Sequence, residues 1–379
     1  MLSALRWFEA LIPAYTIERL FWESRGITIQ EVVYIEIVYA VIVMFLEVPT
    51  GVLADRWERR RLLQIGIALE WLSFIVLLLS FSFIGFAMAI SLSAIGSVFR
   101  SGSENALLYE TLVQSSEEST FERLLGHLNA IGLLAAIVAA LSGSWLATMF
   151  SFEFNYMLSI ASLFFATMCS LLLIEPKRLV NDETVTWRQL KTGFHFIWND
   201  SVLLTLTGMF VLAGSAFNFV DEFWQLYARD VDVPIYWFGA VSTVLLLLQL
   251  PGQLLVPLLL RVASAKCWLR IIAIGIGCGF ILLGGFPSQL GLLWMSLMAL
   301  LIGAIEPLYF GVLHRAVPSA IRATTESSVS MMLHGGIIGL GVLFVGGSGI
   351  SLFTAFFGLG LFVCLFQACL QWSPLLKNR

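Results

Sequence analysis

Residues Gly51 to Leu63 read GVLADRWERRRLL and join two long apolar stretches of the chain. Asp55 lies four residues after Gly51, and Arg59 lies four residues after Asp55. In a helix this spacing would stack the three residues on one face. A basic loop that only follows the positive-inside rule is the simpler alternative. Basic bias explains neither the glycine nor the aspartate, so we expect a structured charged turn between two membrane helices.

The composition around this segment indicates that lipid surrounds the protein. Apolar residues make up 59% of the 379 residues and charged residues 12%, against about 45–50% and about 25% in a soluble domain. The five cysteines lie in or beside apolar runs without metal-ligand spacing, so we expect no metal and no cofactor. The first apolar stretch carries charges and lacks a small-residue cleavage site, so we expect it to be retained as a helix.

Twelve stretches are long and apolar enough to span a bilayer, which takes about 20 residues. They are expected at 4–24, 28–52, 62–81, 84–112, 122–150, 153–174, 201–228, 234–260, 268–286, 289–314, 323–346 and 350–372. This pattern predicts an all-α membrane protein with twelve transmembrane helices in two pseudo-symmetric six-helix bundles, 1–174 and 201–379.

One long polar connection, at 175–200, separates the two expected bundles as a cytoplasmic linker. Within it Trp187, Leu190, Phe194 and Ile197 recur at helical spacing. This pattern predicts an amphipathic helix lying on the membrane surface.

The basic residues set the expected orientation. An even number of spans puts both termini on one side, and if that side is the cytoplasm, 16 of the 21 Lys and Arg residues fall inside. Only Arg25 and Arg229 fall outside. Because cytoplasmic loops carry an excess of basic residues, we expect a multi-pass protein of the cell membrane with both termini in the cytoplasm.

The two halves of the sequence resemble each other at two places. ERLFWESRG at 18–26 corresponds to EFWQLYARD at 222–230, and FLEVPTG at 45–51 corresponds to LLQLPGQ at 247–253. Chance similarity between apolar helices is the alternative. Internal repeats of this kind are common in secondary transporters.

The segment Gly51-x-Leu53-Ala54-Asp55-Arg56-x-x-Arg59-Arg60 resembles the signature loop of the major facilitator superfamily. Glu58 stands where that family usually has a second glycine. Two further stretches, RSGSENALLYETL at 100–112 and VPSAIRATTESS at 317–328, resemble those of bacterial drug and metabolite exporters in the superfamily. The similarity extends over the whole chain, through the twelve expected spans and the central linker.

The resemblance implies a cytoplasmic gate. In the family, the aspartate and an arginine of this loop form an inner latch with an acid of span four, beside the N-terminus of span eleven. Here these roles would fall to Asp55, Arg59 and Glu110. The full set of gate residues implied by the motif is Gly51, Asp55, Arg56, Arg59, Arg60 and Glu110.

Ionisable residues inside the expected spans are a second group of candidates, since a charge at the bilayer centre costs at least about 2.5–3.5 kcal/mol. The resemblance implies that spans one, four, seven and ten line the central cavity. The candidates for a substrate or proton pathway are Glu18, Arg19, Glu36, Arg100, Glu104, Asp221, Glu222 and Glu306.

Removal from water favours the protonated form of a carboxyl group, so Glu222, Glu18 and Glu36 are the first candidates for proton carriers. A structural role is the alternative, with Arg19 as the partner of Glu18 and Arg100 as the partner of Glu104. The aromatic side chains of Trp22 and Trp224 are candidates for contact with an apolar substrate.

These features favour a secondary transporter that exports a small amphipathic or drug-like molecule in exchange for protons. An importer of a metabolite or siderophore-like compound on the same fold is the alternative. An integral-membrane enzyme is disfavoured because HExxH and GxSxG sequences and paired aspartates at a membrane edge are missing. No Walker A sequence is present, so we do not expect ATP to drive transport directly. A channel suits two six-span halves less well than a carrier does. The expected partners are the substrate, protons and the lipid bilayer, with no nucleic acid, and the expected state is a monomer.

Overall fold

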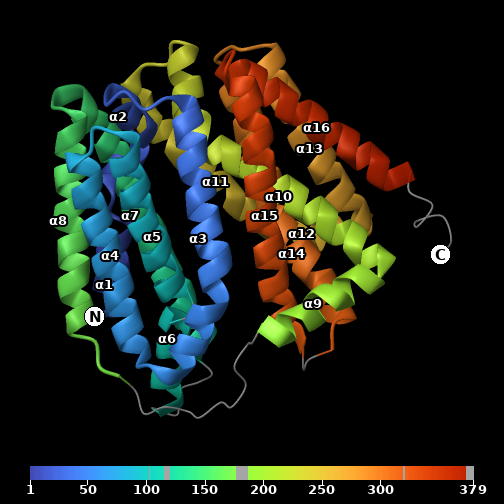
Figure 1. Ribbon diagram of the computed structural model, residues 1–379, viewed down its shortest axis with the longest axis horizontal. Helices are drawn as coiled ribbons and strands as arrows, with labels where there is room; N and C mark the ends of the chain where they lie inside the picture. The colour runs from blue at the N-terminus through green and yellow to red at the C-terminus, as the bar shows by residue number, and fades with distance from the viewer. Residues whose placement is uncertain (102, 115–119, 176–186, 319–320, 373–379) are drawn as a thin grey trace. The chain divides into compact units, whose positions relative to one another are not determined.

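The computed structural model shows a chain folded into helices (Figure 1). It describes residues 1–101, 103–114, 120–175, 187–318 and 321–372. The N-terminal half contains α1 (Leu2–Ala10), η1 (Pro13–Thr16), α2 (Glu18–Ser24), α3 (Ile29–Arg56), α4 (Arg59–Leu79), α5 (Phe83–Ser101), α6 (Ser103–Gln114), α7 (Phe121–Met149) and α8 (Phe152–Leu171). The C-terminal half contains α9 (Trp187–Asn199), α10 (Ser201–Asp230), η3 (Ile235–Trp237), α11 (Phe238–Leu254), α12 (Val256–Val262), α13 (Ala265–Gly285), α14 (Gly291–Ala316), α15 (Arg322–Ser348) and α16 (Leu352–Trp372).

Within the described residues, eleven helices are long and apolar enough to cross a membrane. They correspond to the second through twelfth expected spans, and α5 and α6 together supply the fourth, Phe83–Gln114. The expected all-α membrane fold is therefore confirmed.

The first expected span, 4–24, is not one helix, because it is divided into α1, η1 and α2. Pro13 lacks a backbone N–H and cannot continue the helix of α1. Helix α8 satisfies two of the polar groups freed by this break. The Ala14 N–H donates to the Ser159 hydroxyl (3.0 Å), and the Phe8 carbonyl accepts from the Ser162 hydroxyl (2.8 Å). Inside a membrane such partners are needed, since no water replaces them.

The chain packs as two compact units. Unit 1 comprises Met1–Thr28, Val38–Thr186 and Pro234–Ser242, and unit 2 comprises Ile29–Ile37, Trp187–Val233 and Thr243–Arg379. Each unit thus contains a short segment from the other half of the sequence.

Each unit has its own aromatic core. In unit 1 the indole N–H of Trp22 donates to the Tyr156 hydroxyl (3.3 Å), and its ring packs 4.9 Å from that of Phe86. In unit 2, Phe344 lies between Phe219 and Phe223, with ring centroids 4.8 and 5.0 Å away. These rings bury large apolar surfaces inside the protein rather than in lipid.

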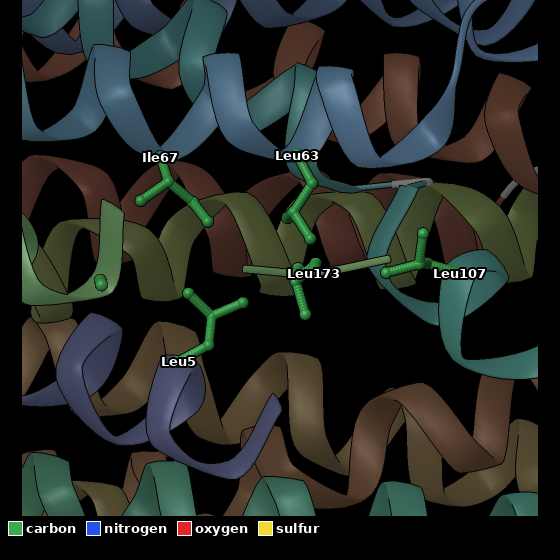
Figure 2. Close-up of a cluster of buried hydrophobic side chains, with 6 residues drawn as sticks. Leu5, Leu63, Ile67, Leu107 and Leu173 are labelled. Carbon is green, nitrogen blue, oxygen red and sulfur yellow. The ribbon is translucent and has the colours of Figure 1, made fainter. Parts of the chain in front are cut away.

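A smaller apolar cluster joins α1, α4 and α6 to the end of α8. The side chains of Leu5, Leu63, Leu107 and Leu173 gather there with that of Ile67 (Figure 2). Leu63 follows Arg59 by one helical turn, and Leu107 precedes Glu110 by about one turn. The cluster therefore holds together the helices that carry the expected gate residues.

The C-terminal ends of α2 and α10 fold alike, close to the ends of the similar sequences at 18–26 and 222–230. Gly26 has φ +85° and Asp232 has φ +58°. After each, an amide bonds back across five residues, from Ile27 to the Trp22 carbonyl (3.1 Å) and from Val233 to the Ala228 carbonyl (2.9 Å). Both helices thus end in the same left-handed cap.

A helix occupies the second half of the expected linker, at α9. Its residues Leu190 and Ile197 are buried, and Ser328 of α15 donates to the Leu190 carbonyl (3.3 Å). At Gly193 an added Cβ would lie 2.9 Å from the Thr324 carbonyl. Part of the apolar face of α9 therefore packs on α15, and a position of this helix at the membrane surface stays a prediction.

Candidate functional site

The turn between α3 and α4 carries the first group of candidates. Helix α3 ends at Arg56 and α4 begins at Arg59. Asp55 and Arg59 therefore belong to different helices, and the expected stacking on one helical face is wrong for Arg59. The chain must reverse here to bring α4 back along α3. The side chains of Gly51, Asp55 and Arg56 lie outside the described residues.

Glu58 is the N-cap residue of α4, with φ −61° and ψ 125°. This is ordinary extended backbone, so the position does not need the glycine that the family usually has there. Its carboxylate pairs with the Arg61 guanidinium (2.8 Å) and lies 3.6 Å from that of Arg60. The departure from the family motif therefore adds an ion pair at the start of the helix.

Arg59 and Glu110 form an ion pair at this end of unit 1. Their atoms Nη2 and Oε1 are 3.0 Å apart, and the Glu110 side chain is 4% exposed. Glu175 accepts from the backbone N–H groups of Arg59 (3.0 Å) and Arg60 (2.8 Å). A carboxylate at a helix N-terminus binds free N–H groups and interacts favourably with the helix dipole. Glu175 thus fixes the first turn of α4, and with it Arg59.

A polar cavity of about 450 Å³ lies inside unit 1. Its charged lining comes from α1, α4, α5 and α6: Arg6, Glu9, Glu70, Arg100 and Glu104. The Arg100 guanidinium is 3.2 Å from the Glu9 carboxylate and 4.0 Å from that of Glu70. Arg6 pairs with Glu104. Three carboxylates and two guanidinium groups therefore line one cavity.

Hydroxyl groups extend this network around Glu70. The Tyr15 hydroxyl donates to Glu70 Oε1 (3.3 Å), and the Ser93 hydroxyl donates to Oε2 (3.0 Å). Arg100 and Glu104 were expected as possible partners, but each pairs with α1. They belong to separate helices, α5 and α6, and α1 supplies a closer opposite charge to each.

A second cavity, of about 340 Å³, lies inside unit 2 between α10, α11, α14 and α15. Asp221 and Glu306 line it together with the amide side chains of Asn218, Gln249 and Gln253. The structure therefore brings together two of the expected pathway acids, one from α10 and one from α14.

Comparisons with known proteins decide the family. The sequence matches the Major Facilitator Superfamily over residues 8–354. The chain belongs to this superfamily. It is a membrane transporter and not an enzyme. No curated protein sequence matches the transporter.

Solved structures share its fold at low sequence identity. The nucleoside transporter NupG has a TM-score of 0.77 and 15% identity, with 100% of this chain and 98% of that chain covered. A D-xylose-proton symporter has a TM-score of 0.73 and 12% identity, with 98% and 96% covered. A POT family transporter in complex with a thioalcohol-conjugated peptide has a TM-score of 0.70 and 14% identity, with 98% and 95% covered.

The remaining pathway candidates of the transporter lie elsewhere. Glu18 and Arg19 pair within α2 at 3.8 Å, as the structural alternative predicts. Within the described residues, Glu36 of α3 and Glu222 of α10 do not line either cavity, although both engage neighbouring groups.

The two tryptophans expected to contact substrate are core residues. Trp22 is 0% exposed and Trp224 is 5% exposed. The Trp22 ring also stacks under the guanidinium of Arg19, 4.3 Å from its centroid. Both side chains are therefore used in packing rather than in contact with a substrate.

Sequence reasoning missed Arg6, Glu9 and Glu70 as members of a site, although all three are charges within or beside expected spans. It also missed Glu175, which stands at the start of the polar linker. The sequence feature that could have identified them is a charged side chain inside an otherwise apolar segment. Their shared cavity was not visible, because α1, α4 and α6 are far apart in sequence.

Proposed function

We propose that the transporter is a proton-coupled secondary carrier that exports a small amphipathic molecule by alternating access. The observation that carries this proposal is the charged cavity of unit 1. It holds three carboxylates, Glu9, Glu70 and Glu104, against two guanidinium groups, Arg6 and Arg100. One carboxylate is in excess.

An unbalanced buried charge is costly, because a site inside the protein stabilises an ion less than water does. Glu9 and Glu70 have side chains only 8% and 6% exposed. One exchangeable proton on the three acids would balance the cavity. We therefore propose that this set binds the coupled proton, in place of Glu222, Glu18 and Glu36, which the sequence ranks first.

Other observations support parts of the proposal. One of the similar solved structures is a proton symporter for D-xylose, which supports proton coupling on this fold. Export is supported by the two stretches at 100–112 and 317–328 that resemble bacterial exporters. Import of a metabolite or siderophore-like compound is the alternative direction. We propose a monomer in the cell membrane, with both termini in the cytoplasm.

We further propose that Asp55, Arg59 and Glu110 form a cytoplasmic gate, with Gly51, Arg56 and Arg60 completing its loop. The Arg59–Glu110 ion pair and the capping of α4 by Glu175 support it. Substitution Asp55→Asn should then abolish transport while the protein still inserts and purifies normally. Arg61→Gln, which changes an exposed pair with Glu58, serves as the control and should keep transport. Wild-type rates in Asp55→Asn vesicles would contradict the gate.

A substrate screen tests the proposed function. Purified transporter is reconstituted into vesicles that contain a pH-sensitive dye, and candidate compounds are added in the presence of a pH gradient. Addition of a substrate should move protons against its own flux, and empty vesicles should show no response. Substrate uptake that is unchanged when the pH gradient is removed would overturn proton coupling.

A further inference from the structure

The cavity of unit 2 differs from that of unit 1 in its charge. It is lined by Asp221 and Glu306, and none of its described lining residues is Lys or Arg. Asp221 and Glu306 are both exposed residues, whereas Val220 and Phe223, near Asp221 on α10, are 0% exposed. The accessibility of Asp221 therefore comes from the cavity and not from the outer surface of α10.

Other lining groups of this cavity also lack partners. His334 of α15 lines it, and the Nδ1 atom of this side chain is buried without a hydrogen-bond partner among the described residues. Pro307 lies inside α14 and has no N–H to give to the Gly303 carbonyl one turn earlier. Gly303 is itself a lining residue. The lining therefore includes an unpaired ring nitrogen and a helical turn that lacks the hydrogen bond of Pro307.

The side chains that line the cavity indicate the charge and the chemical class of the molecule that it would bind. Two carboxylates without a lysine or arginine attract positive charge, and the amide oxygens of Asn218, Gln249 and Gln253 can add partial negative charge around it. An anion would find no lysine or arginine side chain among the described lining residues, and His334 is the one histidine there.

A bare metal ion fits the cavity less well than an organic cation does. Within the described residues, no group of three or more His, Cys, Asp or Glu side chains could hold a metal ion. The volume of about 340 Å³ and the apolar side chains of Ile302, Leu333 and Ile337 suit a molecule with an apolar body.

We propose that the unit 2 cavity binds an organic cation, with Asp221 and Glu306 as its counter-charges. This assignment rests on the proposed function, because it names the class of substrate that the carrier would move. The two units would then have different roles. The unit 1 cavity would bind the proton, and the unit 2 cavity would bind the cationic substrate.

Equilibrium binding to the purified, detergent-solubilised transporter tests the assignment without any proton gradient. The probe is benzyltrimethylammonium, titrated by calorimetry, and phenylmethanesulfonate is the matched anion with the same aromatic body and a tetrahedral head. The cation should bind saturably with one site, and the anion should not bind. Asp221→Asn and Glu306→Gln should each weaken cation binding at least tenfold.

Two variants keep the test decisive. Asp230→Asn, at the end of the same helix and paired with Arg229, should leave the Kd within twofold. Asp221→Glu should retain binding, which separates loss of charge from loss of fold. Equal binding of the anion, no saturable binding of the cation, or an unchanged Kd in both Asp221→Asn and Glu306→Gln would overturn the assignment. Loss of proton coupling with cation binding intact would contradict the proposed function alone.

Discussion

At the scale of single residues, the Arg59–Glu110 ion pair is more buried than the pairs of Glu58 with Arg60 and Arg61 at the start of α4. Replacement Glu110→Gln leaves a largely buried guanidinium without its counter-charge, which we expect to lower the free energy of unfolding by about 3 kcal/mol. Arg61→Gln removes an exposed pair and should cost less than about 1 kcal/mol. Thermal unfolding in detergent measures both. Equal melting temperatures for the two variants would contradict a structural role for the buried pair.

Gly26 and Asp232, which both have left-handed backbone, predict opposite effects of substitution on the free energy of unfolding. Asp232→Gly should raise the free energy of unfolding by about 0.5–1 kcal/mol, because glycine adopts φ +58° without a Cβ clash. Gly26→Ala should lower it by about 1 kcal/mol, because alanine is strained at φ +85°. The same unfolding assay checks both, and shifts of the same sign would contradict the shared cap.

The sequence identified many of the charged residues of the site but not how they pair. Arg59 and Glu110 do meet, as the resemblance implies, and Asp221 and Glu306 do share a cavity. Arg100 and Glu104 pair with Glu9 and Arg6 instead of with each other. A charged residue inside an apolar segment can be recognised in the sequence. Its ion-pair partner cannot, because that partner depends on which helix faces pack together.

At the scale of elements, the break between α1 and α2 depends on hydroxyl groups of α8. Ser159→Ala leaves the Ala14 N–H without its side-chain partner and should lower the free energy of unfolding by about 1–3 kcal/mol. Among the described residues, the Ser142 hydroxyl donates only within its own helix, to the Val138 and Ala139 carbonyls. Ser142→Ala should therefore change the free energy of unfolding by less than about 0.5 kcal/mol. Similar effects of both changes on thermal unfolding would show that α8 does not support the break.

This break also shows where prediction from sequence ends. Pro13 was visible within the expected span 4–24, but a proline inside a membrane segment is compatible with a kinked, continuous helix. The break persists because α8 supplies the missing hydrogen bonds. The Ser159 hydroxyl accepts from the Ala14 N–H, and the Ser162 hydroxyl donates to the Phe8 carbonyl. These residues lie about 145 and 154 positions from their partners. By contrast, the eleven helical segments of the described residues that are long and apolar enough to cross a membrane follow from apolar length alone, and all were predicted.

At the scale of the whole molecule, the two cavities divide the charges of the transporter unequally. The unit 1 cavity contains ion pairs with one carboxylate in excess, and the unit 2 cavity contains two carboxylates without a lysine or arginine among its described lining. The acids expected to form one pathway line two cavities, one inside each unit. The different charge of the two cavities gives each unit a distinct proposed role.

Proton coupling through the unit 1 cavity is tested most directly by neutralising one of its acids. Glu104→Gln is compared in vesicles with Glu153→Gln, whose carboxylate pairs with Arg25 outside the cavity at 3.1 Å, and with Glu222→Gln. The measurement is proton flux per substrate moved under a pH gradient. We expect Glu104→Gln to abolish substrate-linked proton flux, and Glu153→Gln and Glu222→Gln to retain it. Normal proton flux in Glu104→Gln, or its loss only in Glu222→Gln, would contradict the account.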